Sequence, residues 1–396
     1  MSGVVRRGAV VLAVAVVSVA VLLAPPAARV VDARIGPTPV LAYYYIWFEP
    51  SSWDRAKIDY PLLGRYSSDD AAIMEQHILE AKAAGIDGFI VSWKSSARLD
   101  SRLETLATLA EKHDFKLVVI YESLDFGRQP LPVDQIRDDI ATFADRWGDR
   151  PAFDLFDKAA LIISGSWEFT PQELQTMIGD ARDRILVLAS ERNVQAYGLI
   201  SSLVDGNAYY WSSANPESAG FAKKLKAMGE AVHDTDGLWI APASPGFDAR
   251  LVGGTRVIDR ADGDTLRAEV AAAAQSSPDA LGIISWNEFS ENSHIEPSEQ
   301  FGRTALDTLA ELTGKSTDGV SLGPMDFDSE RQDDAAGTIS DVEKALAITG
   351  LVGLLVIAWV VLVRRRRRHG SEPAAGSARD GGPSGPGIDP EGPRAV

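Results

Sequence analysis

Between residues 37 and 313 the chain alternates short apolar segments with longer segments whose apolar residues recur every three or four positions. The short segments are rich in β-branched residues, and this predicts strands. The longer ones predict amphipathic helices, one after each strand. We expect strands at 40–47, 86–93, 116–121, 159–164, 185–190, 204–211, 237–242 and 281–286, and helices at 69–85, 101–113, 132–147, 170–182, 191–201, 218–232, 264–275 and 302–314.

This alternation predicts an α/β fold. Strands that are apolar on both faces are typical of a parallel sheet covered by helices. Eight β–α units in about 280 residues fit a (β/α)₈ barrel of the TIM type. An open, doubly wound sheet is the alternative, but no G-x-G-x-x-G follows the first strand, which argues against a dinucleotide site.

Two uncharged apolar runs lie outside the alternating region. The first, residues 8–24, follows Arg6 and Arg7 and predicts a signal peptide or an uncleaved signal anchor. The second, Ala345–Val363, has 19 residues, enough to cross a bilayer as a helix, and five arginines follow it directly.

The arginines beside both runs predict how the chain is placed at a cell membrane. Positively charged flanks stay cytoplasmic, so we expect the chain between the two runs to lie outside the cytoplasm. The chain is single-pass if the first run is cleaved and two-pass if it is not. The predicted parts are a signal segment (1–35), a barrel (36–315), an acidic stalk (316–344), a transmembrane helix (345–363) and a basic, then disordered cytoplasmic tail (364–396).

Charge and composition narrow the functional classes. The formal net charge of −17 argues against a nucleic-acid partner. The chain has no cysteine, which excludes disulfides and thiolate metal sites, and its five histidines make a histidine metal site improbable. We therefore expect neither a metal nor another cofactor.

Aromatic and acidic residues gather where the predicted strands end. In a (β/α)₈ barrel the carboxyl ends of the strands carry the functional side chains. Aromatic rings stack on the apolar faces of sugars, and carboxylates and amides hydrogen-bond to sugar hydroxyls, so this set indicates a carbohydrate cleft. The predicted substrate contacts are Tyr45, Trp47, Trp93, Tyr121, Glu122, Asp205, Tyr209, Trp211, Asn287 and His294.

Glu288 and Glu291 follow the last predicted strand and are the candidate catalytic residues. Hydrolysis of a glycosidic bond needs one carboxyl group to protonate the leaving oxygen and a second group at the anomeric centre. The alternative is that both are acids in the first turn of the next helix, where the helix dipole favours them.

Several segments of the chain resemble glycoside hydrolase family 99, the endo-α-mannosidase family. The segment NEFSENSHIEPS, residues 287–298, is similar to the family signature N-E-W-x-E-G-T-x-I-E-P. The segments YYYIWFEP, YPLLGRYSSDD and AGIDGFIVSW are similar to the family's opening, and DGNAYYW and SPGFDARL to later elements, so the resemblance spans most of residues 40–297. Phe289 stands where the signature has Trp, Ser290 where the mannosidases often have His, and Ala249 where the family has an Asp.

This resemblance implies a (β/α)₈ barrel that acts within α-mannoside chains and retains anomeric configuration. It implies that Glu288 deprotonates the sugar's own 2-hydroxyl group and that Glu291 serves as general acid and then general base. The substrate is expected to be an α-mannoside-containing or related cell-envelope polysaccharide. A non-catalytic carbohydrate-binding barrel and an envelope assembly protein are the alternatives.

Other polar residues are interpreted as structural. His77 is expected to be a packing histidine, and Asp69 or Asp70 is expected to cap a helix. Asp248 and Arg250 are expected to form an ion pair that braces a loop. Glu296, together with His294, is expected to support the loop that carries the two glutamates.

Overall fold

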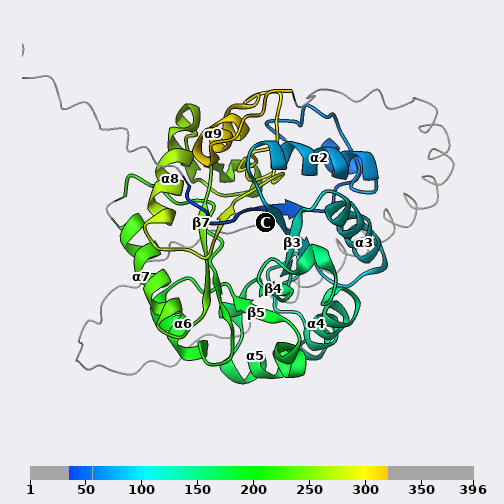
Figure 1. Ribbon diagram of the computed structural model, residues 1–396, viewed down its shortest axis with the longest axis vertical. Coiled ribbons are helices and arrows are strands. Elements are labelled where there is room, and N and C mark those ends of the chain that lie inside the picture. The colour runs from blue at the N-terminus through cyan, green and yellow to red at the C-terminus, as the bar shows by residue number, and fades with distance from the viewer. Residues whose placement is uncertain (1–34, 56, 219, 320–396) are drawn as a thin grey trace, which may run out of the picture. The chain divides into compact units, whose positions relative to one another are not determined.

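Eight parallel strands close into a barrel in the computed structural model, which describes residues 35–55, 57–218 and 220–319 (Figure 1). The order around the barrel is β1-β10-β7-β6-β5-β4-β3-β2, so the first and last strands pair, and the predicted (β/α)₈ barrel is confirmed over an open sheet. The strands are β1 (Val40–Tyr45), β2 (Gly88–Trp93), β3 (Lys116–Tyr121), β4 (Ala160–Ile163), β5 (Leu186–Ala189), β6 (Gly206–Ala208), β7 (Leu238–Ala243) and β10 (Ala280–Ile283).

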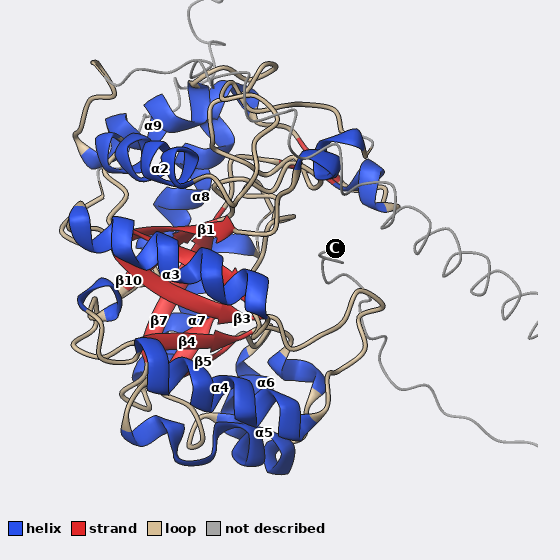
Figure 2. Cartoon of the chain, turned by 90° about the vertical axis from the view of Figure 1, so that its right-hand side faces the viewer, coloured by secondary structure: helices blue, strands red, loops and turns tan. Residues whose placement is uncertain are grey.

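An α-helix follows each barrel strand, as the alternation predicts, and Figure 2 shows these helices outside the strands. Polar residues start several of them: Asp70 accepts the backbone N–H of Ala72 at 2.9 Å at the start of the first helix. This confirms the capping role expected for Asp69 or Asp70. The helices are α2 (Ala71–Ala83), α3 (Ala97–Lys112), α4 (Val133–Trp147), α5 (Pro171–Ile178), α6 (Val194–Ile200), α7 (Phe221–His233), α8 (Asp264–Ala274) and α9 (Thr304–Thr313).

Side chains alternate between the barrel interior and the layer between strands and helices. Successive residues of a strand point to opposite faces. In β1, Leu41 and Tyr43 lie in the interior cluster, whereas Tyr44 packs in the outer one. Gly282 of β10 leaves room for the Tyr43 ring, since a Cβ there would lie 3.1 Å from it. The same alternation decides which residues at the strand ends face the barrel mouth.

A short hairpin and two 3₁₀ turns lie between β7 and α8. Strands β8 (Phe247–Asp248) and β9 (Val257–Ile258) pair antiparallel outside the barrel, and the turns are Ala249–Val252 and Ala261–Gly263. Within the hairpin, the guanidinium Nε of Arg250 donates to Asp248 at 2.9 Å. The ion pair expected here is confirmed, and it braces the segment beside Glu291.

The predicted signal segment up to residue 34, the predicted acidic stalk after residue 319, the transmembrane helix and the cytoplasmic tail lie outside the described residues. Within the ranges that the structure describes, no helix combines the length and the apolar character needed to cross a membrane.

Candidate active site

Asn287 fastens the loop after β10 to the end of β1. Its Oδ1 accepts the backbone N–H of Tyr45 at 2.8 Å, and its Nδ2 donates to the carbonyl oxygen of Tyr45 at 3.0 Å. Nδ2 also lies 3.3 Å from the hydroxyl of Tyr66. The carboxamide is fully buried, and both its oxygen and its nitrogen form hydrogen bonds within the protein. Asn287 therefore holds the loop that carries the two glutamates in place. A side chain buried in this way is not placed to make the contact with substrate that the sequence predicts for it.

Glu288 follows directly and is 6% exposed. Its backbone N–H donates to the Ser285 hydroxyl at 2.7 Å, and its Oε1 accepts the N–H of Ser290 at 2.9 Å. Burial raises the pKa of the Glu288 carboxyl group, while the ammonium of Lys57 lowers it. Lys57 also donates to the Ser290 hydroxyl. A buried carboxylate of raised basicity beside a lysine is suited to accepting a proton.

Glu291 is 1% exposed and accepts the Ser212 hydroxyl at 3.2 Å through Oε2. Its carbonyl oxygen accepts the N–H of Asp248 at 2.8 Å, which ties it to the braced hairpin. The next helix, α9, begins only at Thr304. The alternative that Glu288 and Glu291 are first-turn acids of a helix is therefore wrong.

Aromatic residues from β1 and β6 face the two glutamates. The hydroxyls of Tyr45 and Tyr210 lie 2.8 Å apart, and the Tyr45 ring stacks on Trp47 at 4.4 Å between centroids. Burial, and then the charges of Glu288 and Glu291, raise the pKa of Tyr45 well above its ordinary value. Both tyrosines therefore stay protonated and can donate or accept hydrogen bonds at the mouth.

A depression opens beside this tyrosine pair. Tyr45, Trp47, Tyr210 and Glu122 all line it. Oε1 of Glu122 accepts the Ser92 hydroxyl at 2.8 Å, and burial raises the pKa of Glu122. The exposed fraction of Trp47, 37%, leaves its ring open to a ligand. The expected contacts Tyr45, Trp47 and Glu122 are thus brought together, with the apolar rings and polar groups that a sugar site needs.

A buried hydrogen-bond network supports the loop of Glu288 and Glu291 from below. Glu296 accepts the Tyr66 hydroxyl at 2.8 Å and lies 3.2 Å from Nε2 of His77, whose Nδ1 lies 2.9 Å from the Tyr44 hydroxyl. His77 therefore bridges Tyr44 and Glu296 within the buried network. The expected structural role of His77 and supporting position of Glu296 agree with these contacts.

His294 lies on the other flank of the same loop. Its Nε2 is 3.0 Å from the Asp59 carboxylate, and its ring stacks on Phe289 at 4.0 Å between centroids. Burial lowers the pKa of His294 to about 4. Since the ring is 1% exposed, its placement supports the loop and does not suit a substrate contact.

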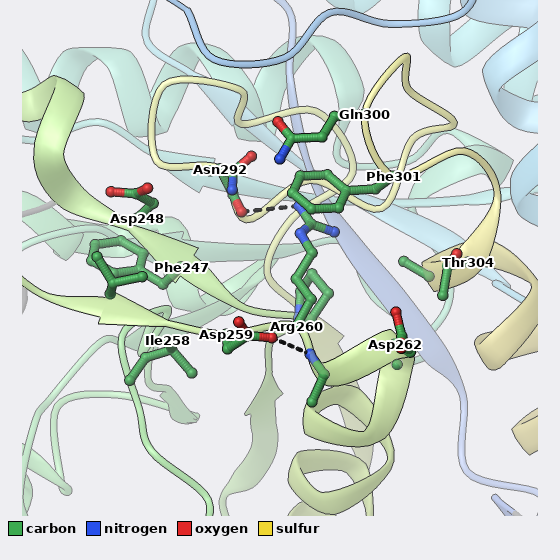
Figure 3. Close-up of a pocket in the computed structure, with 15 residues that line it drawn as sticks. Phe247, Asp248, Ile258, Asp259, Arg260, Asp262, Asn292, Gln300, Phe301 and Thr304 are labelled. Carbon is green, nitrogen blue, oxygen red and sulfur yellow. Dashed lines mark hydrogen bonds between the residues drawn. The ribbon is translucent and has the colours of Figure 1, made fainter.

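A second pocket, of about 300 Å³, lies beside the β8–β9 hairpin. Figure 3 shows Arg260 between Asn292 and Phe301. The guanidinium lies 4.1 Å from the Phe301 ring centre and donates to the carbonyl oxygen of Asn292 at 2.9 Å. Burial lowers the pKa of Arg260 to about 10. This pocket wall therefore holds the backbone directly after Glu291.

Three predicted contacts point away from the mouth, toward the helices. Trp93 is fully buried and donates to Asp100 at 3.0 Å, and the Tyr121 hydroxyl donates to Asp139 at 2.8 Å. Tyr209 belongs to the same outer layer. Each lies one position from an inward-facing residue, so strand alternation places all three on the wrong face for substrate.

Of the two remaining predicted contacts, Asp205 lies away from the mouth and Trp211 lies at its rim. Asp205 precedes β6, at the amino end of the strands, where it accepts Arg182 at 2.7 Å and the N–H of Val187 at 2.8 Å. It braces the end of the barrel opposite the site. Trp211 is half-buried at the mouth rim, 5.3 Å from the Phe221 ring of α7.

The structure adds residues to the site that were not among the predicted contacts. Tyr210 could have been found from alternation, since Ala208 two positions earlier is interior. Lys57 lies in the β1–α2 loop, and no sequence signal linked it to Glu288. Arg128 and Arg192 follow the ends of β3 and β5 and line the depression.

Comparison with known proteins points to one family. A family model described as Glycosyl hydrolase family 99 matches residues 49–305, well over half of the chain. A zebrafish (Danio rerio) glycoprotein endo-alpha-1,2-mannosidase-like protein is 25% identical over 284 residues, 64% of this chain and 63% of the relative. A rat (Rattus norvegicus) glycoprotein endo-alpha-1,2-mannosidase is 23% identical over 60% of this chain and 56% of the relative. The chain thus spans about three fifths of the length of these relatives.

Solved structures share the fold. A GH99 endo-alpha-mannosidase from Bacteroides thetaiotaomicron aligns with a TM-score of 0.62 and 21% identity, over 69% of this chain and 96% of that one. A structure described as a glycoside hydrolase-like protein aligns with a TM-score of 0.56 and 16% identity, over 70% and 94% of the two chains. These likenesses support the barrel architecture.

Proposed function

Since the chain belongs to glycosyl hydrolase family 99, we propose that it is a retaining, endo-acting glycoside hydrolase. Its proposed substrate is an α-mannoside-containing or related cell-envelope polysaccharide. The observation that carries the proposal is the buried pair Glu288 and Glu291, held in one loop close enough to Tyr45 and Tyr210 for both carboxylates to raise the pKa of both tyrosines. The names of the relatives in the comparison agree with this substrate class.

In the proposed reaction Glu288 acts as the base. It removes the proton from the substrate's 2-hydroxyl group, whose oxygen then attacks the anomeric carbon, as in substrate-assisted exceptions to the two-carboxylate scheme. Burial raises the pKa of Glu288 and makes its carboxylate a stronger base, while the ammonium of Lys57 favours the ionised form that this role requires.

Glu291 acts as the general acid and then as the general base. It first protonates the leaving oxygen as the bond from the 2-oxygen to the anomeric carbon forms and the glycosidic bond breaks, which gives a 1,2-anhydro sugar. It then takes a proton from the water that attacks the anomeric carbon, and as the bond to the 2-oxygen breaks Glu288 returns its proton to that oxygen. The Ser212 hydroxyl and the Asp248 N–H hold the residue in place. The hydroxyls of Tyr45 and Tyr210, which are hydrogen-bonded to each other near both carboxyl groups, can also hydrogen-bond to the substrate there.

We further propose that the hydrolase is tethered outside the cytoplasm. The support is the run Ala345–Val363 with its five following arginines, together with the arginines before the first apolar run. Membrane fractionation and protease protection of a tagged full-length chain test this proposal. Protease added outside intact cells should cleave the barrel, and recovery of the protein in the soluble fraction would refute the membrane tether.

The test of activity uses the full-length protein and a panel of α-mannans of defined linkage. Glu288→Gln and Glu291→Gln should each abolish product release, while Glu230→Gln, an exposed acid on α7, should not. NMR of early products should show retained anomeric configuration. Glycan binding without any cleavage by the wild-type protein would refute the hydrolase and support a carbohydrate-binding barrel.

A further inference from the structure

Two arginines enter the depression from separate loops. Arg128 comes from the β3–α4 loop and Arg192 from the β5–α6 loop, and both line the depression with Tyr45 and Trp47. The two guanidiniums are close enough for Arg128 to lower the pKa of Arg192, although burial is the larger cause. Like charges repel, so their convergence on one small site needs an explanation.

Aromatic stacking holds one of the two in place. The guanidinium carbon of Arg192 lies 3.6 Å from the centre of the Trp167 ring. Stacking occupies the flat face of a guanidinium and leaves the N–H groups at its edge able to bind a planar or tetrahedral anion. Trp167 also lines the depression, so those donors are held beside it.

Neither side chain forms an ion pair or a hydrogen bond with another described residue, although the chain has a large excess of acids. The nearby carboxylates form hydrogen bonds with other residues: Glu122 accepts Ser92 at 2.8 Å, Glu191 accepts Ser166 at 2.6 Å, and Glu168 accepts Trp167 at 2.9 Å. The charges of Glu168 and Glu191 still raise the pKa of Arg192, and Arg128 lowers the pKa of Glu122, but none of the three forms an ion pair with either arginine.

Arg102 and Arg182 show how other buried or partly buried arginines of the described residues can be ion-paired, whereas Arg260 is held by a backbone carbonyl oxygen and an aromatic ring. Arg102 donates to Asp69 at 2.7 Å from both Nε and Nη2, and Arg182 donates to Asp205 at 2.7 Å. A partly buried cation that forms no direct ion pair is costly, and the cost is reduced when an anion binds to it. Lys224 lies close to Arg192 and adds positive charge at the same rim.

We propose that Arg128 and Arg192 bind an anionic group, a phosphate or a carboxylate, carried by the sugar that occupies the depression. The substrate class is then an acidic glycan, and the neutral face of the same sugar rests on Trp47 and Tyr45. This inference rests on the proposed function, since it assigns the charge of the glycan that the same site holds.

Calorimetric titration of the full-length protein tests the inference. The probes are methyl α-mannoside, mannose 6-phosphate, methyl α-mannosiduronate and inorganic phosphate. At low salt, at least one acidic sugar should bind about tenfold or more tightly than the neutral sugar, since a charge-assisted hydrogen bond contributes that much. High salt should reduce the difference. The phosphate and uronate probes show which anion is bound.

The variants are chosen to separate a binding role from a structural one. Arg128→Gln with Arg192→Gln should remove the preference for acidic sugars, and Arg128→Lys with Arg192→Lys should restore part of it. Lys158→Gln with Arg184→Gln is the matched control: it removes the same charge at the amino end of the strands and should leave the preference unchanged.

Equal binding of neutral and acidic sugars would overturn the inference. Persistence of the preference in the glutamine variant, or inorganic phosphate binding as tightly as the sugar phosphate, would also overturn it. Cleavage of neutral α-mannan without any acidic preference would leave the proposed function standing and remove this inference. A preference for acidic sugars with no cleavage of any glycan would refute the hydrolase and leave the arginine site.

Discussion

Replacing Asn287 by Ala should destabilise the barrel and disable the site together. The change removes three buried hydrogen bonds and leaves the N–H and carbonyl oxygen of Tyr45 without partners in a water-free environment. An unsatisfied buried polar group costs about 1–3 kcal/mol. Two such groups should lower the free energy of unfolding by about 4 kcal/mol, and this should lower the midpoint temperature of thermal unfolding by roughly 10 °C.

Thermal unfolding followed by calorimetry measures this loss, with Asn193→Ala as the matched control. Asn193 makes one hydrogen bond, to the N–H of Ala196 at the exposed start of α6, so its loss should cost about 1 kcal/mol. Below its midpoint the Asn287 variant should bind substrate weakly and turn it over slowly, because Tyr45 has lost its anchor. A midpoint no lower than that of the Asn193 variant would refute the reasoning.

Three further perturbations test the site and its surroundings. Lys57→Met should raise the pKa of Glu288, and since the base works only above its pKa, the acid limb of the pH–activity profile should move to higher pH. His294 has a pKa of about 4 in the folded chain against about 6.5 when unfolded. As pH falls from about 6.5 to about 4, only the unfolded state takes up a proton, so the free energy of unfolding should drop by up to about 1.4 kcal/mol per pH unit. His294→Gln should make the free energy of unfolding less dependent on pH in this range. Asp205→Asn should lower the unfolding midpoint by a few degrees through loss of the Arg182 pair, with KM unchanged.

Each of these three predictions can be checked against a control variant or against a result that would contradict it. Lys226→Met, on the exposed face of α7, should leave the acid limb in place; an equal shift in both variants would show a general charge effect. A His294→Gln variant with the same pH dependence as the wild type would assign that dependence to other groups. A large rise in KM for Asp205→Asn would restore Asp205 as a substrate contact.

The barrel could be predicted from sequence because its pattern is local and repeated eight times. Each strand is apolar on both faces and each helix has one apolar stripe, so single segments carry the signal. Even the weakest predicted helix, at 191–201, is present as α6.

The site was predicted less completely, because strand ends do not reveal which face a side chain takes. Tyr209 and Tyr210 are adjacent and chemically alike, yet only the second shares the interior face with Ala208. Asp205 was placed at the wrong end because β6 begins at Gly206, after it, whereas the apolar run starts earlier. Lys57 donates to Ser290, 233 positions away in sequence, and this places its charge near Glu288; no local pattern predicts such a contact.

The pairing of β1 with β10 has a consequence for biosynthesis. Tyr45 and Asn287 are 242 positions apart, and the hydrogen bonds between them exist only when the first and last strands meet. A chain emerging from a ribosome or a translocon therefore carries an incomplete site until its final β–α unit has appeared. Nascent chains and fragments truncated before β10 should be inactive however well their earlier units fold, so that catalysis begins only once the whole barrel has been made.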